Sequence, residues 1–260
     1  MHSKEDATPL TRFQVVLVIL ALACGGFGIG TGEFAIMGLL PDVAATFQVT
    51  TPQAGYVISA YAMGVVVGAP LIAIAGAKAS RRSLLLILMS VFTVGNLASA
   101  MAPDFLSFTV LRFLTGLPHG AYFGVSALVV ASLVPVQMRA QAVGYVMMGL
   151  TVATLLGTPV MAYFGQSLNW RVLFLSVGVI GAITVTLIWL YLPRDKSSEG
   201  ATVMRELVAF THPQVLLTLT LAATGFGGMF SIFSYIVGTA TEVANMPAGM
   251  VPVIMALFGV

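Results

Sequence analysis

The chain has 260 residues, of which 58% are hydrophobic and 8% are charged, and its formal net charge is +2 at pH 7. Because soluble domains carry about 25% charged residues, this composition excludes an ordinary soluble enzyme or binding module and indicates an integral membrane protein. The basic residues are too few for a nucleic-acid surface. The single cysteine, Cys24, cannot form an intrachain disulfide and gives no sign of redox or metal chemistry.

Apolar stretches, most of them about twenty residues or longer, follow one another from Phe13 to Val260. A bilayer core roughly 30 Å thick needs about twenty apolar residues per helix, and these runs are too continuously apolar for barrel strands. Breaks such as Pro41-Asp42 and Pro103-Asp104 carry turn residues. The sequence therefore predicts an all-α membrane fold with helices at 13–40, 53–75, 83–102, 105–134, 140–164, 171–192 and 213–239, and part of an eighth from 247.

The basic residues fall mainly on one side of these helices. Nine of the eleven precede the first helix or lie in the loops after the second, fourth and sixth: Lys4, Arg12, Lys78, Arg81, Arg82, Arg139, Arg194, Lys196 and Arg205. Because cytoplasmic loops are enriched in Lys and Arg, the sequence predicts a cytoplasmic N-terminus.

The seventh helix repeats features of the first, and the eighth repeats features of the second. Gly225-Phe226-Gly227 matches Gly26-Phe27-Gly28, and Pro247 matches Pro52 at nearly the same offset. Two copies in one orientation are the parallel-repeat plan of some transporters. We expect residues 1–192 to form a six-helix unit, 193–212 a cytoplasmic loop, and 213–260 the start of a second unit. Since the sequence stops within the eighth span, we expect a fragment that does not transport by itself.

Two buried charges are candidates for function. A charge inside the membrane costs about 2.5–3.5 kcal/mol on insertion scales and usually faces a cavity or a partner. Glu33 lies eight residues before Pro41, and Arg112 lies eight residues after Asp104, so both lie roughly 12 Å below the outer surface. We expect Glu33 and Arg112 to interact, directly or through water, in proton coupling or cavity opening. The alternative is a static pair that fixes helix packing.

Other polar residues share faces of the predicted helices. In the fourth helix the spacing of 3, 4, 3 and 4 places five side chains on one face, which is typical of a cavity lining. They are Arg112, Thr115, His119, Tyr122 and Ser126. His119 is a second candidate proton carrier, although a neutral, hydrogen-bonded histidine is the open alternative. Phe230 and Tyr235 of the seventh helix belong either to a substrate wall or to ordinary packing.

Several segments resemble the major facilitator superfamily, drug:proton antiporter type, and within it the bacterial arabinose-efflux-permease-like group. They are residues 32–41, 52–70 and 111–120, the Gly-rich antiporter motif at Gly144, Gly149, Gly157 and Pro159, and the basic loop motif at Lys78, Arg81 and Arg82. Thr158 separates the usual Gly-Pro pair, and Ala77 and Ser80 replace the Asp and Gly of the loop motif.

The resemblance implies a transporter of the bacterial inner membrane that exports sugars or amphipathic drugs in exchange for protons. It would act by alternating access, as a monomer without cofactor, metal or nucleic acid. A receptor or assembly subunit with a transporter-like fold is the alternative. An intramembrane enzyme using Glu33 and His119 would need a further acid or metal ligand, and the sequence offers none at ligand spacing.

Overall fold

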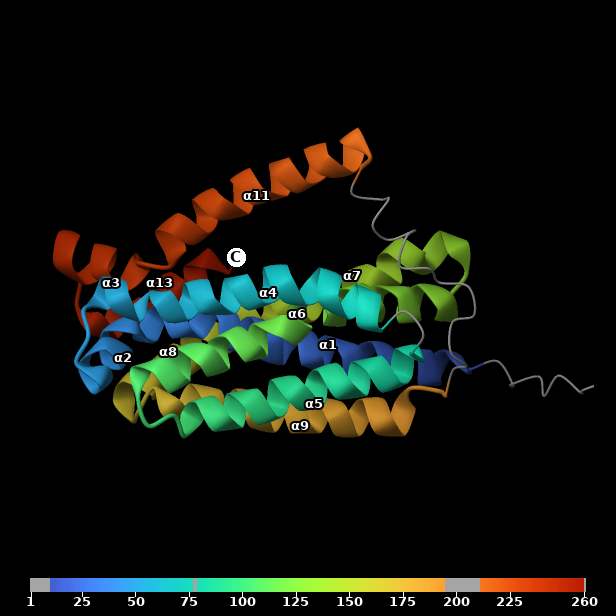
Figure 1. The fold of residues 1–260 in the computed structure, drawn as a ribbon, viewed down its shortest axis with the longest axis horizontal. Coiled ribbons are helices and arrows are strands. Elements are labelled where there is room, and N and C mark those ends of the chain that lie inside the picture. Colours follow the sequence, from blue (N-terminus) through green and yellow to red (C-terminus); the bar gives the residue numbers. More distant parts are fainter. Residues whose placement is uncertain (1–9, 77–78, 195–210, 260) are drawn as a thin grey trace, which may run out of the picture.

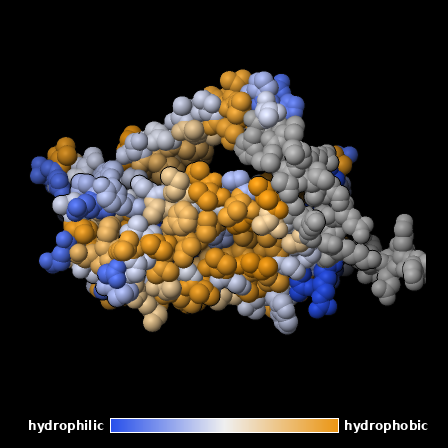
Figure 2. All heavy atoms as spheres, viewed as in Figure 1, coloured by the Kyte–Doolittle hydropathy of each residue, from blue (hydrophilic) through white to orange (hydrophobic). Residues whose placement is uncertain are grey.

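The structure is a computed structural model that describes residues 10–76, 79–194 and 211–259. Seven helices are long and apolar enough to cross a membrane, and Ala248–Phe258 is a shorter apolar helix. This confirms seven spans and part of an eighth. The helices lie side by side along the long axis of the molecule (Figure 1). Hydrophobic side chains cover the middle of the visible face and hydrophilic ones gather toward its two ends (Figure 2), as expected of a bilayer-spanning bundle.

The spans are built from the following elements. The first two contain α1 (Arg12–Phe34), η1 (Ala35–Leu39), α2 (Leu40–Phe47), α3 (Thr51–Ala54) and α4 (Tyr56–Ala75). The next four contain α5 (Arg81–Ala100), α6 (Phe105–Leu133), η2 (Val136–Met138), α7 (Arg139–Val152), η3 (Ala153–Gly157), α8 (Thr158–Ser167) and α9 (Arg171–Tyr191). The last contain α11 (Pro213–Phe233), α12 (Ile236–Gly238), η4 (Thr239–Val243), η5 (Ala248–Met250) and α13 (Val251–Phe258).

The predicted end of the first helix at residue 40 is wrong. Pro41 stands in the first turn of α2, where its missing N–H leaves no hydrogen bond unmade, so helical structure continues to Phe47. The helix ends instead at Gln48, whose φ of 57° is left-handed. The span is therefore 36 residues long, and Glu33 lies near its middle.

Polar caps begin several of these helices. Thr11 caps α1 together with Gln14, Thr50 caps α3 together with Gln53, and Asp104 caps α6. Each side-chain oxygen accepts a backbone N–H that would otherwise lack a partner at the helix start. These caps fix where each span begins relative to the residues deep inside it.

Helices α4 and α6 approach closely because glycines face each other. A Cβ added to Gly116 would lie 3.1 Å from the carbonyl carbon of Tyr61 and 3.2 Å from Cα of Gly64. Small residues at a membrane-helix crossing allow such backbone contact. The crossing sets Tyr61 of α4 against the part of α6 that carries Arg112 and His119.

The fifth span contains a π-helical turn, η3, between α7 and α8. Gly149 and Gly157 are eight residues apart, which in an unbroken α-helix would rotate them about 80° from each other. The extra residue of a π turn reduces that angle to about 20°, and both glycines then face α1. A Cβ on Gly149 would lie 3.0 Å from the Phe27 amide nitrogen, and one on Gly157 would lie 3.1 Å from the Phe27 ring.

Candidate functional site

The candidate site lies in the middle of the bundle, where α1, α4 and α6 meet. Glu33 stands in the last turn of α1 and His119 at the centre of α6. Glu33 Oε2 and His119 Nδ1 are 3.9 Å apart, and the two side chains keep 17% and 14% of their surface exposed. This pair is therefore reachable from outside the packed interior, as a proton carrier must be.

Tyr61 connects this pair to the buried arginine. Its hydroxyl lies 2.9 Å from His119 Nδ1, and the Arg112 guanidinium carbon lies 4.2 Å from the centre of its ring. Tyr61 is 2% exposed and Arg112 1%. We call Glu33, His119, Tyr61 and Arg112 the central cluster. It runs from two partly exposed titratable groups to a fully buried cation.

We expected Glu33 and Arg112 to interact directly or through water. Within the described part of the chain, Glu33 lies within ion-pair distance of His119 and not of Arg112, so the direct contact is absent and an interaction through water stays a prediction. Arg112 instead packs between two aromatic rings, those of Tyr61 and Phe174, the latter 5.4 Å away. Counting residues from Pro41 and Asp104 placed Glu33 and Arg112 at the same depth. In the structure the guanidinium of Arg112 packs on the aromatic ring of Tyr61 instead.

The guanidinium of Arg112 has unmet hydrogen-bonding capacity. Its Nε and Nη1 are buried and make no hydrogen bond to any described residue. A buried charge without a hydrogen-bonding partner is unfavourable, and contact with aromatic faces recovers about 2 kcal/mol when desolvated. Arg112 therefore provides a fixed positive field in the centre of the bundle.

The protonation state of His119 determines whether its Nδ1 accepts or donates a hydrogen bond, and to which neighbour. A neutral imidazole without a proton on Nδ1 accepts the Tyr61 hydroxyl hydrogen, whereas an imidazolium donates Nδ1–H toward Glu33 or the Tyr61 oxygen. Since Tyr61 and Glu33 both face this one nitrogen, protonation of either Glu33 or His119 changes the hydrogen bonds of the other. A change in protonation would therefore alter the hydrogen bonds that join α1, α4 and α6 at this point.

The three remaining polar residues of the predicted α6 face are enclosed. Thr115 donates to the carbonyl of Arg112 over 3.0 Å, Tyr122 donates to the carbonyl of Leu22 over 2.8 Å, and all three of Thr115, Tyr122 and Ser126 are 0% exposed. Tyr122 thereby joins α6 to α1. Contact of these three residues with a substrate stays a prediction.

The seventh span and the turn after it contribute aromatic side chains that pack against the first two spans. Phe230 stacks on Phe34, the neighbour of Glu33, with ring centres 5.6 Å apart. Tyr235 is 46% exposed, and a Cβ on Gly55 would lie 2.8 Å from its hydroxyl. Phe230 thus packs on the residue that follows Glu33 in α1, and its role in substrate contact stays a prediction.

The two motifs of the resemblance lie away from the cluster. Gly149 and Gly157 pack against α1, while Gly144 has open space around it and Pro159 stands in the first turn of α8. In the basic loop, Arg81 donates to the Leu128 carbonyl over 3.4 Å and Arg82 to the Trp189 carbonyl. Lys78 lies outside the described residues.

Tyr61 was missed by the sequence reasoning. It lies in an apolar helix beside small residues, in the run Ala60-Tyr61-Ala62, and the signal available was a hydroxyl without a polar neighbour in the middle of a span. Buried tyrosines of this kind usually find a hydrogen-bond partner.

Tyr61 provides a test of the cluster. Tyr61→Phe keeps the ring under Arg112 and removes one hydrogen bond, so unfolding of the purified protein in detergent should be easier by about 0.6 kcal/mol. Tyr61→Leu also removes the aromatic face and should cost about 2 kcal/mol more. Equal losses for the two variants would show that the ring does not stabilise the guanidinium.

An all-helical bundle with titratable groups at its centre defines a multi-pass membrane protein with the architecture of a secondary transporter. The Major Facilitator Superfamily matches residues 22–260. The chain belongs to this superfamily and comprises its N-terminal six-helix bundle and the start of the C-terminal bundle.

Relatives extend this assignment. The chain is 41% identical to the inner membrane transport protein YdhP of Escherichia coli over 242 residues, covering 93% of this chain and 62% of YdhP. It is 36% identical to the putative transporter AraJ of the same organism, covering 93% and 61%. It is 30% identical to the chloramphenicol resistance protein of Streptomyces lividans, covering 94% and 63%. The chain thus spans about three fifths of the length of these relatives.

A solved structure shares the fold. The inward-facing, unoccupied bacterial homologue of the human lysosomal transporter Spinster superposes with a TM-score of 0.76 at 17% identity, covering 96% of this chain and 60% of that one. At this identity the likeness concerns the fold alone.

Proposed function

We propose that this chain is part of a secondary transporter that exports small solutes, sugars or amphipathic drugs, in exchange for protons. The observation that carries the proposal is the central cluster, in which Glu33 and Tyr61 both face Nδ1 of His119. Buried ionisable residues in membrane helices usually mark transport or proton pathways. The names of the relatives support the substrate class, since one is a chloramphenicol resistance protein.

In the proposed cycle Glu33 and His119 exchange a proton with the cavity. Without the transported proton, Glu33 is ionised and neutral His119 accepts the hydroxyl hydrogen of Tyr61. With it, one proton taken up from the cavity is held between Glu33 and His119, whose Oε2 and Nδ1 atoms are 3.9 Å apart. Arg112 remains positive throughout, so the charge of the Glu33–His119 pair changes by one unit and that of Arg112 does not. The two bundles would move around this site by alternating access.

We further propose a cytoplasmic N-terminus in a bacterial inner membrane, a monomer, and the division into residues 1–192, 193–212 and 213–260. The enrichment of Lys and Arg near one end of the spans supports the orientation. A proton moved inward gains about 2.3 kcal/mol per 100 mV, and this free energy would drive export. The reaction makes and breaks no covalent bond in the solute.

Cells expressing the complete gene provide the test. They should survive higher concentrations of chloramphenicol or of toxic sugars than control cells, and a protonophore should abolish the difference. Everted vesicles should release protons from their lumen when substrate is added. Saturable ligand binding with no proton movement would instead support a receptor or assembly subunit and would contradict the proposed exchange.

A further inference from the structure

A largely apolar cavity lies between α1 and α7, outside the central cluster. Its volume is about 920 Å³, which is within the range of cavities that hold a drug-sized ligand. Its lining begins beside Arg12, at the start of α1, and reaches Phe27. These two residues are roughly 22 Å apart along the helix, so an elongated molecule would fill the cavity better than a compact one.

The polar groups of this cavity lie toward one end. Arg12 is the first residue of α1, and Gln141 and Tyr145 lie in the first half of α7. Gln141 Nε2 donates a hydrogen bond to the Tyr145 hydroxyl oxygen over 2.8 Å, so the hydrogen of that hydroxyl can be given to an acceptor on a ligand. The part nearer the middle of the bundle is lined by apolar side chains such as those of Phe27 and Val152. A ligand with one hydrogen-bond-accepting end and a long apolar body matches this division.

The charges on this side of the bundle favour a negatively charged ligand. Arg12 is the only charged residue among the described ones that line the cavity. The acids of the described chain are Glu33 in the central cluster and, at the opposite end of the bundle, Asp42, Asp104 and Glu242. Between Arg12 and the central cluster the described residues therefore offer a cationic solute no negative charge, whereas an anionic solute is attracted by Arg12.

We propose that this cavity is the entry site of the exported solute and that it prefers an amphipathic organic anion, such as a medium-chain carboxylate. The carboxylate would lie against Arg12 and accept the hydrogen of Tyr145, and the hydrocarbon chain would lie between α1 and α7 toward Phe27. This assignment rests on the export proposed above. An anion that leaves and a proton that enters both move down the membrane potential, whereas a cation that leaves in exchange for a proton transfers no net charge.

Cys24 allows this binding to be measured without a transport assay. It lines the cavity, is half-buried and is the only cysteine of the chain, so a ligand in the cavity should slow its reaction with a maleimide. The purified chain in phosphatidylcholine nanodiscs would be treated with decanoate, methyl decanoate or decylamine, which share a hydrocarbon chain and differ in the charge of the end group. Decanoate should protect Cys24 at the lowest concentration, and decylamine should protect it least.

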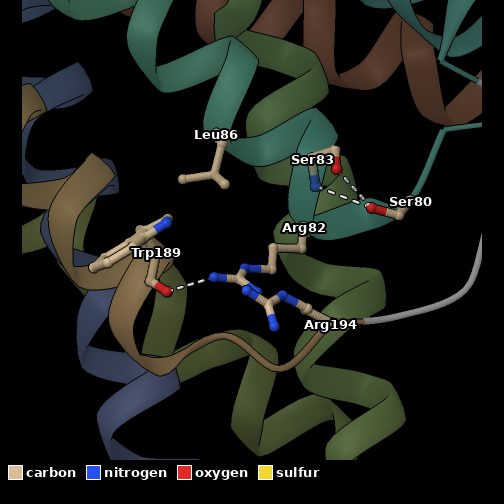
Figure 3. A pocket seen from close by; sticks show the side chains of 6 residues that line it. All are labelled: Ser80, Arg82, Ser83, Leu86, Trp189 and Arg194. Atoms are coloured by element: carbon tan, nitrogen blue, oxygen red, sulfur yellow. Dashed lines mark hydrogen bonds between the residues drawn. The ribbon is translucent and has the colours of Figure 1, made fainter.

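Variants of Arg12 show where the charged end group lies. Arg12→Gln should raise the decanoate concentration needed for protection about fivefold and leave methyl decanoate unaffected, whereas Arg12→Lys should keep most of the protection because the charge remains. Arg194→Gln is the matched control. Arg194 is exposed at the same end of the bundle but lines another cavity, between the start of α5 and the end of α9 (Figure 3), so its loss should change nothing.

The comparison of end groups can contradict the proposal in two ways. Protection by decylamine that equals or exceeds that by decanoate, unchanged in Arg12→Gln, would overturn the preference for an anion. No protection by any of the three compounds would show that bilayer lipid or neighbouring helices fill the cavity and would overturn the entry site. Either result leaves proton-driven export of another solute standing, and a loss of proton coupling in cells would leave the binding of decanoate unchanged.

Discussion

Glu33→Gln, introduced in the complete gene, is expected to abolish proton-driven export while leaving the protein folded. The amide has nearly the shape of the carboxyl group but takes up no proton in the physiological range, so residue 33 could no longer carry the transported proton. Uphill accumulation in everted vesicles should fall to the background level, a loss of at least about tenfold, because each proton supplies about 2.3 kcal/mol per 100 mV. Binding of substrate should persist.

Glu242→Gln is the matched control for this variant. Glu242 lies in η4, is exposed and lies outside the central cluster, so its neutralisation should leave proton-driven export unchanged. Full coupling in Glu33→Gln would show that Glu33 is a packing residue and that protons use another route. A loss of both binding and coupling would indicate damage to the cavity and would likewise contradict a role confined to the proton.

Gly116→Val is expected to produce the largest loss of stability. The added side chain would collide with the backbone of α4 at Tyr61 and Gly64, and backbone cannot yield as the end of a flexible side chain can. Overpacking of this kind costs about 1–3 kcal/mol and occasionally more, so we expect at least about 2 kcal/mol. Thermal unfolding of the purified protein in detergent would measure it.

The same helix offers the control. Gly124 of α6 has nothing within 4 Å of an added Cβ, so Gly124→Val carries the same change in helix propensity without the collision. A similar loss for the two variants would show that propensity, and not the α4–α6 crossing, sets the effect. Because this crossing places Tyr61 against Arg112 and His119, Gly116→Val should also disturb the central cluster.

The number of spans and their depth were predictable because hydropathy and length decide both. The predicted end of the first helix was wrong because the sequence does not distinguish a proline in the first turn of a helix from one that follows a helix end, and Pro41 is of the first kind. Glu33 and His119 were expected far from the ends of their helices, and both lie well inside the spans Arg12–Phe47 and Phe105–Leu133. Their contact was not predictable, because residue spacing fixes positions along and around one helix but not how neighbouring helices turn toward each other.

The same limit explains why the contacts of Arg112 were not predicted. Counting from Pro41 places Glu33 level with Arg112, but helical structure continues to Phe47, and the short α4–α6 distance allowed by Gly64 and Gly116 brings Tyr61 against the guanidinium. The distance between α4 and α6 depends on how the surfaces of the two helices fit together. The residue pattern of one helix carries no information about that fit. The spacing of Tyr122 also predicted that it lines a cavity. In the structure its hydroxyl donates a hydrogen bond to a backbone carbonyl of α1.

The widened turn of η3 accommodates one extra residue in the fifth span without changing the helix face that meets α1. Deleting one residue between Ala153 and Gly157 would restore ordinary α-helical geometry and leave Gly157 seven residues after Gly149, a difference in direction of about 20°. Gly157 would then still face Phe27 of α1. Relatives that lack the extra residue must therefore reach the same contact with a small side chain at a different spacing from Gly149, and an ungapped alignment would pair the wrong positions.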